Sequence, residues 1–137
     1  MELVMEEAKR SVLKFDNPRV VEFDFKISPE FDSSKYKAFG INYQTSITKR
    51  EVNIADVSLA VKVGLDGETV PFTIYAKVQA TFNWEEGLET SIVDKLLNVN
   101  AKILLLSYLR PLVSHITVDA GYPPFIIPFL DFSEEND

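Results

Sequence analysis

Alternation of apolar and polar residues divides the first two thirds of the chain into predicted strands. In residues 70–84 every second residue is apolar, and the residues between them are mostly polar. A pattern of period two is typical of strands that bury one face. Residues 57–65 repeat the pattern, and Asp66-Gly67 lies between the two segments. Because glycine adopts positive φ at little cost, this pair predicts a tight hairpin.

Three earlier segments have strand character: 11–18, 21–27 and 39–47. The first should end at Asn17-Pro18, since proline cannot donate to a strand ladder. The polar link 48–53 is short, which suits an antiparallel connection to the next strand.

From Thr90 the apolar spacing becomes helical and continues to about residue 120. Thr90 or Ser91 is a suitable N-cap, and Gly121 is placed to end the helix. Pro111 should kink or restart the helix, because it lacks a backbone donor. The helix is apolar most of the way round between residues 103 and 112, so more than one side must be covered.

In so short a chain, the second cover of this helix is expected to be another subunit, in a homo-oligomer. The predicted interface residues are Leu105, Tyr108, Leu109, Leu112 and Ile116. Together the elements predict an α+β fold, with a four-stranded antiparallel sheet and a long C-terminal helix packed on one face. Residues 1–137 should form a single domain.

Composition limits the possible functions. Apolar residues make up 46% of the chain, far more than in a disordered protein. A net charge of -7 repels phosphate backbones and disfavours nucleic acid as a partner. The absence of cysteine excludes disulfides, thiol catalysis and thiolate metal sites. The N-terminus lacks a signal core, and the run "ILLLSYL" is far shorter than the roughly 20 residues of a membrane span. We therefore expect a cytoplasmic protein without membrane insertion.

Candidate catalytic side chains are sparse. His115 is the one histidine, and a lone histidine on an apolar helix is most often structural. The carboxylates lack the spacing of a calcium loop, and the glycines form no phosphate-binding motif. We expect no catalytic residue, no metal and no cofactor.

Aromatic residues without strand periodicity are the main candidates for a binding surface. Phe31 and Tyr36 lie in the predicted loop 28–36, and the C-terminal "GYPPFIIPFLDF" combines aromatics with three prolines. Such residues can staple the core, meet a partner or line an apolar groove. The residues proposed to bind a polypeptide client are Phe31, Tyr36, Phe39, Tyr122, Phe125, Ile127 and Phe129.

The order of several short motifs resembles the SecB family of export chaperones, tetramers that hold unfolded preproteins for the SecA motor. The similar segments are "KFDNP", "AVKVGLDGETVPF", "AKVQATF", Tyr108-Leu109-Arg110 and "GYPPFIIPFLDF". They span residues 10–132 in the family's order. The resemblance implies a four-stranded sheet with a helix on one face, a dimer of dimers through that helix, and grooves for unfolded segments.

Two departures qualify the resemblance. The family continues after the final "DF" into a helix that lids the groove, whereas this chain stops five residues after Phe132. SecA docks on an acidic sheet face in the family, and Lys77 stands where an acid is expected, which argues against SecA as a partner. A divergent SecB-like group that includes uncharacterised proteins and toxin–antitoxin chaperones matches better.

Three functions follow from these observations. The first is a holdase that binds unfolded or nascent polypeptides through strand edges and an apolar groove. The second is a dedicated partner of one protein, such as an antitoxin or a regulatory segment. The third, a small-molecule enzyme, ranks last because the chain offers few polar groups that could converge in a pocket.

Overall fold

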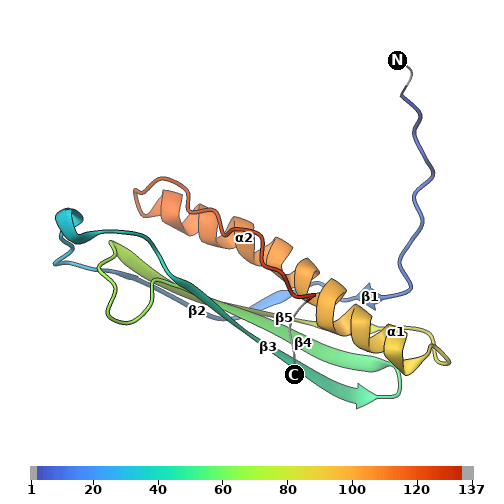
Figure 1. Cartoon of the computed structure of the whole chain (residues 1–137). Coiled ribbons are helices and arrows are strands. Elements are labelled where there is room, and N and C mark those ends of the chain that lie inside the picture. The colour runs from blue at the N-terminus through green and yellow to red at the C-terminus, as the bar shows by residue number, and fades with distance from the viewer. Residues whose placement is uncertain (1–2, 134–137) are drawn as a thin grey trace.

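The structure has two layers, a sheet and one long helix that lies across one of its faces (Figure 1). It is a computed structural model that describes residues 3–133, so the ends of the predicted domain 1–137 lie outside the described residues. All strand pairs are antiparallel, in the order β1-β5-β4-β3, and β2 also pairs with β5. The strands are β1 (Lys14–Phe15), β2 (Arg19–Ile27), β3 (Ile41–Glu51), β4 (Ile54–Val63) and β5 (Phe72–Asn83).

β1 and β2 share one edge of the sheet. Phe15 pairs with Phe82 and Ile27 pairs with Phe72, so both strands run along β5. Asn17-Pro18 separates them, as predicted, because proline has no N–H to donate. The sheet therefore contains five strands, one more than predicted, but it is only four strands wide because β1 and β2 lie end to end along β5.

The β3–β4 connection is tighter than predicted. β3 extends to Glu51 and β4 begins at Ile54, so most of the expected link 48–53 is strand, and the turn is Val52-Asn53. Asn53 holds the turn against the end of β5, since its side-chain amide donates to the carbonyl of Trp84 at 2.8 Å.

The β4–β5 connection is longer than the tight hairpin predicted from Asp66-Gly67. Gly67 does adopt a positive φ of 82°, but β4 ends at Val63 and β5 begins only at Phe72. Gly64 also has a φ of 82°, and Pro71 lacks a donor, so the ladder cannot continue between them. The result is a loop over residues 64–71 that stands at one end of the sheet.

The predicted alternation of buried and exposed residues is confirmed in both central strands. In β5, side chains from Phe72 to Phe82 alternate between buried and half-buried, and the buried set faces the helix. β4 contributes residues to the same core, and its Val57, Leu59 and Val63 are fully buried. The core therefore lies between these two strands and the helix.

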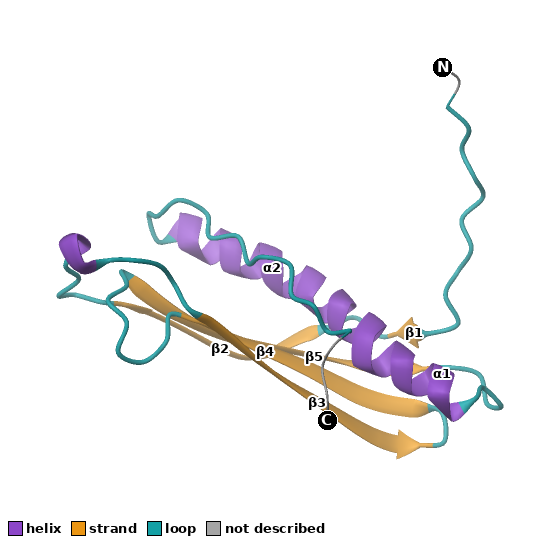
Figure 2. Cartoon of the chain, in the orientation of Figure 1, coloured by secondary structure: helices purple, strands orange, loops and turns teal. Residues whose placement is uncertain are grey.

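The helix runs without interruption from Thr90 to Asp119 (Figure 2). It comprises α1 (Thr90–Lys95), a π-helical turn (Leu96–Asn100) and α2 (Ala101–Asp119). Its N-cap is Glu89, one residue before the predicted Thr90 or Ser91, and no side chain caps it. By length and composition this stretch could cross a membrane, yet one face is buried against the sheet, which is usual for a core helix.

Pro111 does not restart the helix, because α2 runs through it from Ala101 to Asp119. Its side chain is exposed, so its ring lies on the solvent side rather than between helix and sheet. The helix side facing the sheet carries Val93, Leu97, Ala101, Leu105, Leu109, Val113 and Thr117, at a constant spacing of four. The π-helical turn lies within this row and helps keep it on one side, because it inserts a residue into the helical repeat.

Gly121 ends the helix as predicted. With a φ of 95° it allows Tyr122 N–H to donate to Thr117 at 3.0 Å and its own N–H to donate to Val118 at 3.0 Å, a Schellman motif. The chain then turns back and runs beside α2 without regular secondary structure (Figure 1).

This returning C-terminal segment, residues 122–132, acts as a staple. Ile127 and Phe132 are buried at 0% and 2% exposure. The Phe132 ring meets Tyr43 of β3 edge to face, with centroids 5.2 Å apart. Segments from opposite halves of the chain are thereby joined along one flank of the helix.

Candidate aromatic binding site

Three segments far apart in sequence meet at one end of the sheet and form an apolar cavity of about 450 Å³. Within residues 3–133, no charged side chain lines it. We call it the aromatic cavity. Its lining residues are Phe31, Ser33, Tyr36, Phe39, Pro71, Phe72, Tyr122, Pro123, Pro124 and Phe125.

Phe39 is the central ring of this cavity. Its centroid lies 4.8 Å from that of Phe72, 5.0 Å from Phe125 and 5.8 Å from Tyr36. The contacts to Phe125 and Tyr36 are edge to face, an arrangement that aromatic quadrupoles favour. Tyr122 completes the group by packing on Phe72 at 4.9 Å.

Local hydrogen bonds shape two of the three segments of the cavity wall. In the crossover between β2 and β3, Asp32 caps a 3₁₀ turn (Ser33–Lys35) by accepting from the Ser34 hydroxyl at 2.7 Å and from its N–H at 3.0 Å. Both bonds lower the pKa of Asp32 below its usual value, and the bond from the Ser34 hydroxyl has the larger effect. In the C-terminal segment, Phe125 N–H donates to the hydroxyl of Thr117 at 2.9 Å. The aromatic side chains therefore project from loops whose backbones are held in place.

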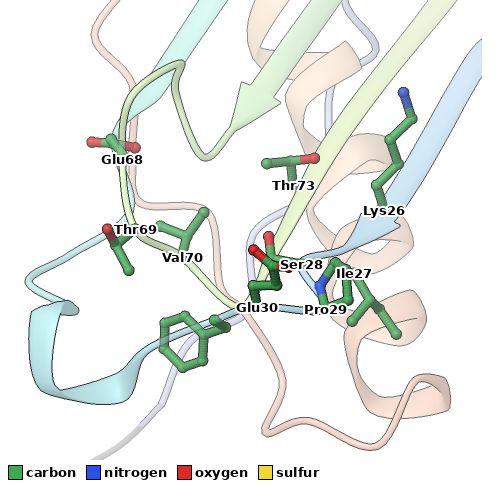
Figure 3. A pocket seen from close by; sticks show the side chains of 10 residues that line it. Lys26, Ile27, Ser28, Pro29, Glu30, Glu68, Thr69, Val70 and Thr73 are labelled. Carbon is green, nitrogen blue, oxygen red and sulfur yellow. The ribbon is translucent and has the colours of Figure 1, made fainter.

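A second cavity of about 480 Å³ lies on the other side of the crossover, and we call it the polar pocket (Figure 3). Figure 3 shows side chains from the end of β2, the crossover and the β4–β5 connection around it. Phe31 lines both cavities. The other lining residues are Lys26, Ile27, Ser28, Pro29, Glu30, Glu68, Thr69, Val70 and Thr73.

The predicted client-binding residues separate into two groups. Phe31, Tyr36, Phe39, Tyr122 and Phe125 all line the aromatic cavity.

Ile127 and Phe129 lie elsewhere. Ile127 is fully buried in the core and cannot contact a client, so its inclusion was wrong. Phe129 is 89% exposed beneath the Arg110 guanidinium, whose centre is 5.0 Å from the ring centroid. In the proline-rich segment no periodicity indicates which side chains turn inward.

Sequence reasoning missed the cavity wall formed by Pro71 and Phe72, and it did not name Pro123 and Pro124 within the C-terminal segment that it singled out. Alternation assigned Phe72 to the core, and it is indeed buried at 3% exposure, yet it also forms the base of the cavity. The signal that could have found this wall is the Pro71-Phe72 pair directly after a glycine-containing loop.

The predicted interface residues also separate. Leu105 and Leu109 are fully buried against the sheet within one chain, so another subunit cannot contact them. Leu112 and Ile116 are half-buried against the core, and Tyr108 is 41% exposed. The helix is apolar on several sides partly because the returning C-terminal segment covers one flank. Its exposed apolar residues are Ile92, Ile103, Tyr108 and Val118.

The polar groups predicted to have no catalytic or metal-binding role are dispersed in the part of the chain that the structure describes. His115 is exposed rather than packed in the core. Among residues 3–133, no three His, Asp or Glu side chains are arranged to hold a metal ion.

Comparison with known proteins decides the family. The family model described as preprotein translocase subunit SecB matches residues 16–134. The chain belongs to the SecB family. SecB of Anaplasma marginale is 29% identical over 126 residues, which are 88% of this chain and 72% of that protein. An uncharacterized protein of Methanocaldococcus jannaschii is 27% identical over 128 residues, 90% of this chain and 82% of the relative.

A solved structure supports the same fold for this SecB-family chain. The SecB-like chaperone of Mycobacterium tuberculosis, in complex with a ChAD peptide from the HigA1 antitoxin, superposes with a TM-score of 0.69. The match covers 86% of this chain and 90% of that one, at 11% sequence identity. The predicted α+β fold, with a long helix on one face of an antiparallel sheet, is therefore confirmed.

Proposed function

We propose that this SecB-family protein is a non-enzymatic, cytoplasmic holdase chaperone that binds apolar side chains of unfolded or nascent polypeptides in the aromatic cavity. The observation that supports this is the cavity's lining, which is aromatic and proline-rich and carries no charge among the described residues. Aromatic and apolar walls bind many different side chains, because dispersion and burial require no particular hydrogen-bonding partner.

The cavity is also reachable. Tyr36 is 42% exposed, and Phe31 is half-buried at the boundary with the polar pocket. Burial of one phenyl-sized client side chain contributes about 1.5–3 kcal/mol, so an extended segment needs several weak contacts to bind stably. Weak, repeated contacts suit a protein that must release its clients.

The test is suppression of aggregation of an unfolded client, followed by light scattering. The wild type at several-fold excess should suppress the signal, and Phe31→Ser/Tyr36→Ser should lose most of this activity. Val52→Ser/Ile126→Ser is the matched control, since these exposed side chains lie outside the cavity. A wild type without suppression would rule out the holdase function, and equal activity of the cavity variant would rule out the site.

A second candidate function is the dedicated binding of one partner. It is supported by the structural neighbour, which was solved with an antitoxin peptide. Purification of the tagged protein from its native cells distinguishes the two proposals. One partner at stoichiometric amount favours a dedicated protein, whereas many partners at low amounts favour a general holdase.

We also propose a homo-oligomer, dimer or tetramer, that uses the exposed apolar residues of the helix. Ile103 and Val118 are both 51% exposed, and Ile92 is 44% exposed. Sedimentation at micromolar concentration should show more than one chain, and Ile103→Asp should lower the mass. A wild-type monomer under these conditions would contradict this proposal.

Docking to the SecA motor is not part of the proposal. On the sheet face away from the helix, Lys77 replaces an expected acid and pairs with a neighbouring carboxylate. The charged pairs on this face are Glu22–Lys77 at 3.8 Å, Asp24–Lys26 at 3.5 Å and Asp56–Arg50 at 3.1 Å. Because each of these three acids has a base within 4 Å, much of the negative charge that the family resemblance requires is compensated on this face. We expect no SecA binding at micromolar concentration in a direct titration.

A further inference from the structure

The loop that carries Phe39 is tied to the β4–β5 connection by one carboxylate. Glu68 Oε1 accepts from Gly40 N–H at 2.9 Å and from Leu65 N–H at 2.6 Å. Glu68 stands on the β4–β5 connection beside the polar pocket (Figure 3). One side chain thus joins the end of the crossover to a segment 28 residues away in sequence.

Gly40 allows this close approach because it has no side chain. A Cβ at this position would lie 2.7 Å from Glu68 Oε2 and 2.7 Å from the Leu65 Cδ1 atom. Such separations are too short for carbon, so any other residue would push the carboxylate or the loop away. Gly40 also accepts from Gly64 N–H at 2.9 Å, which fixes both sides of the residue.

The bonded N–H belongs to the peptide that links Phe39 to Gly40. A planar peptide moves as one unit, so a fixed N–H direction restricts the backbone rotation that aims the Phe39 side chain. Phe39 is the ring on which Phe72, Phe125 and Tyr36 pack. A shift of this ring would change the shape of the whole aromatic cavity.

We infer that Glu68 is a positioning residue for client binding: its carboxylate holds the Phe39–Gly40 peptide and thereby keeps the aromatic cavity in its binding shape. The inference rests on the proposed function for its effect on affinity. Glu68 itself lines the polar pocket rather than the aromatic cavity, so it acts through Phe39.

The experiment compares Glu68→Ala and Glu68→Gln with Glu30→Ala. Glutamine keeps an oxygen that can accept both N–H groups, whereas alanine removes it. Glu30→Ala is the matched control, because it removes a carboxylate from the same polar pocket but not the one bonded to Gly40. The readouts are hydrogen exchange of the Gly40 amide and the anisotropy of a labelled, extended, aromatic-rich peptide.

Glu68→Ala should speed Gly40 exchange and weaken peptide binding, each by about tenfold, the usual consequence of losing one hydrogen bond. Glu68→Gln should restore both to within about threefold, and Glu30→Ala should leave both unchanged. Unchanged exchange and affinity in Glu68→Ala would overturn the inference. A wild type that binds no peptide would overturn the proposed function instead, and the exchange rates would still decide whether Glu68 holds the peptide bond.

Discussion

Leu109 and Ile103 lie on the same helix, yet the structure assigns them opposite roles. Leu109 is fully buried against the sheet within one chain, whereas Ile103 is 51% exposed. Replacing a buried leucine by alanine removes the transfer free energy of its side chain and leaves a cavity, so Leu109→Ala should lower the free energy of unfolding by about 3 kcal/mol. That corresponds to roughly a hundredfold change in the unfolding equilibrium.

Urea denaturation at one fixed protein concentration measures this effect. With an m-value of about 2 kcal/mol per molar, the Leu109→Ala midpoint should fall by about 1.5 M. Ile103→Ala should change the unfolding of the single chain by less than about 0.5 kcal/mol, since an exposed side chain loses little burial. Its effect should appear in sedimentation instead, as weaker association. The concentration is held fixed because association adds to apparent stability.

The assignment of the two faces fails if Leu109→Ala dissociates the assembly without lowering the stability of the separated chain. It fails equally if Ile103→Ala produces the larger shift in the urea midpoint. Either result would mean that the helix turns a different side toward the sheet.

Three further predictions concern local interactions. Gly121→Ala should lower the melting temperature by about 3 °C. The added Cβ would meet no neighbouring atom, but alanine at a φ of 95° is strained by about 1 kcal/mol. An unchanged melting temperature would contradict this geometry at the helix end. Arg110→Ala should lower the free energy of unfolding by about 1–2 kcal/mol and expose the C-terminal segment to protease, because Arg110 Nε donates to Ile127 O at 2.9 Å and the guanidinium covers the Phe129 ring. Arg110→Lys should have a similar effect, because lysine cannot reproduce this geometry. Hydrogen bonds from the backbone N–H groups of Leu65, the larger cause, and of Gly40 lower the pKa of Glu68 below its usual value of 4.5. The stabilising contribution of the Glu68 carboxylate is therefore present above about pH 4.5 and disappears as the pH falls through the folded-state pKa. The gap in urea midpoint between wild type and Glu68→Gln should therefore shrink below about pH 4.5, and a gap independent of pH would contradict it.

Much of the fold could be predicted because period-two and helical spacing report directly on burial. The alternation in residues 70–84 placed Phe72 and Phe82 on the buried face, and Gly121 ended the helix, as the structure confirms. Errors arose where two local rules competed. Pro111 was expected to kink or restart the helix, but α2 does not restart there. The proline ring lies on the solvent side of α2, where water can donate to the carbonyl that proline leaves without a partner.

The residues predicted to bind a client separate into different environments for a related reason. Phe31 and Tyr36 were singled out because an aromatic residue in a loop has no strand face to explain it, and both line the aromatic cavity. Ile127 and Phe129 were chosen because they lie in the apolar, proline-rich C-terminal segment, but Ile127 is buried in the core and Phe129 is exposed to solvent. Glu68 drew no attention, because an acidic residue in a turn usually only contacts water.

The sequence by itself determined the strands, the helix and its end, because these depend on backbone preferences and burial patterns within a few residues. Only the tertiary structure decided which side of the helix meets the sheet and where the C-terminal segment runs. It also decided that rings at positions 31, 39, 72 and 125 form one cavity. These features depend on the packing of segments distant along the chain, and no local pattern records which distant side chain will fill a given space.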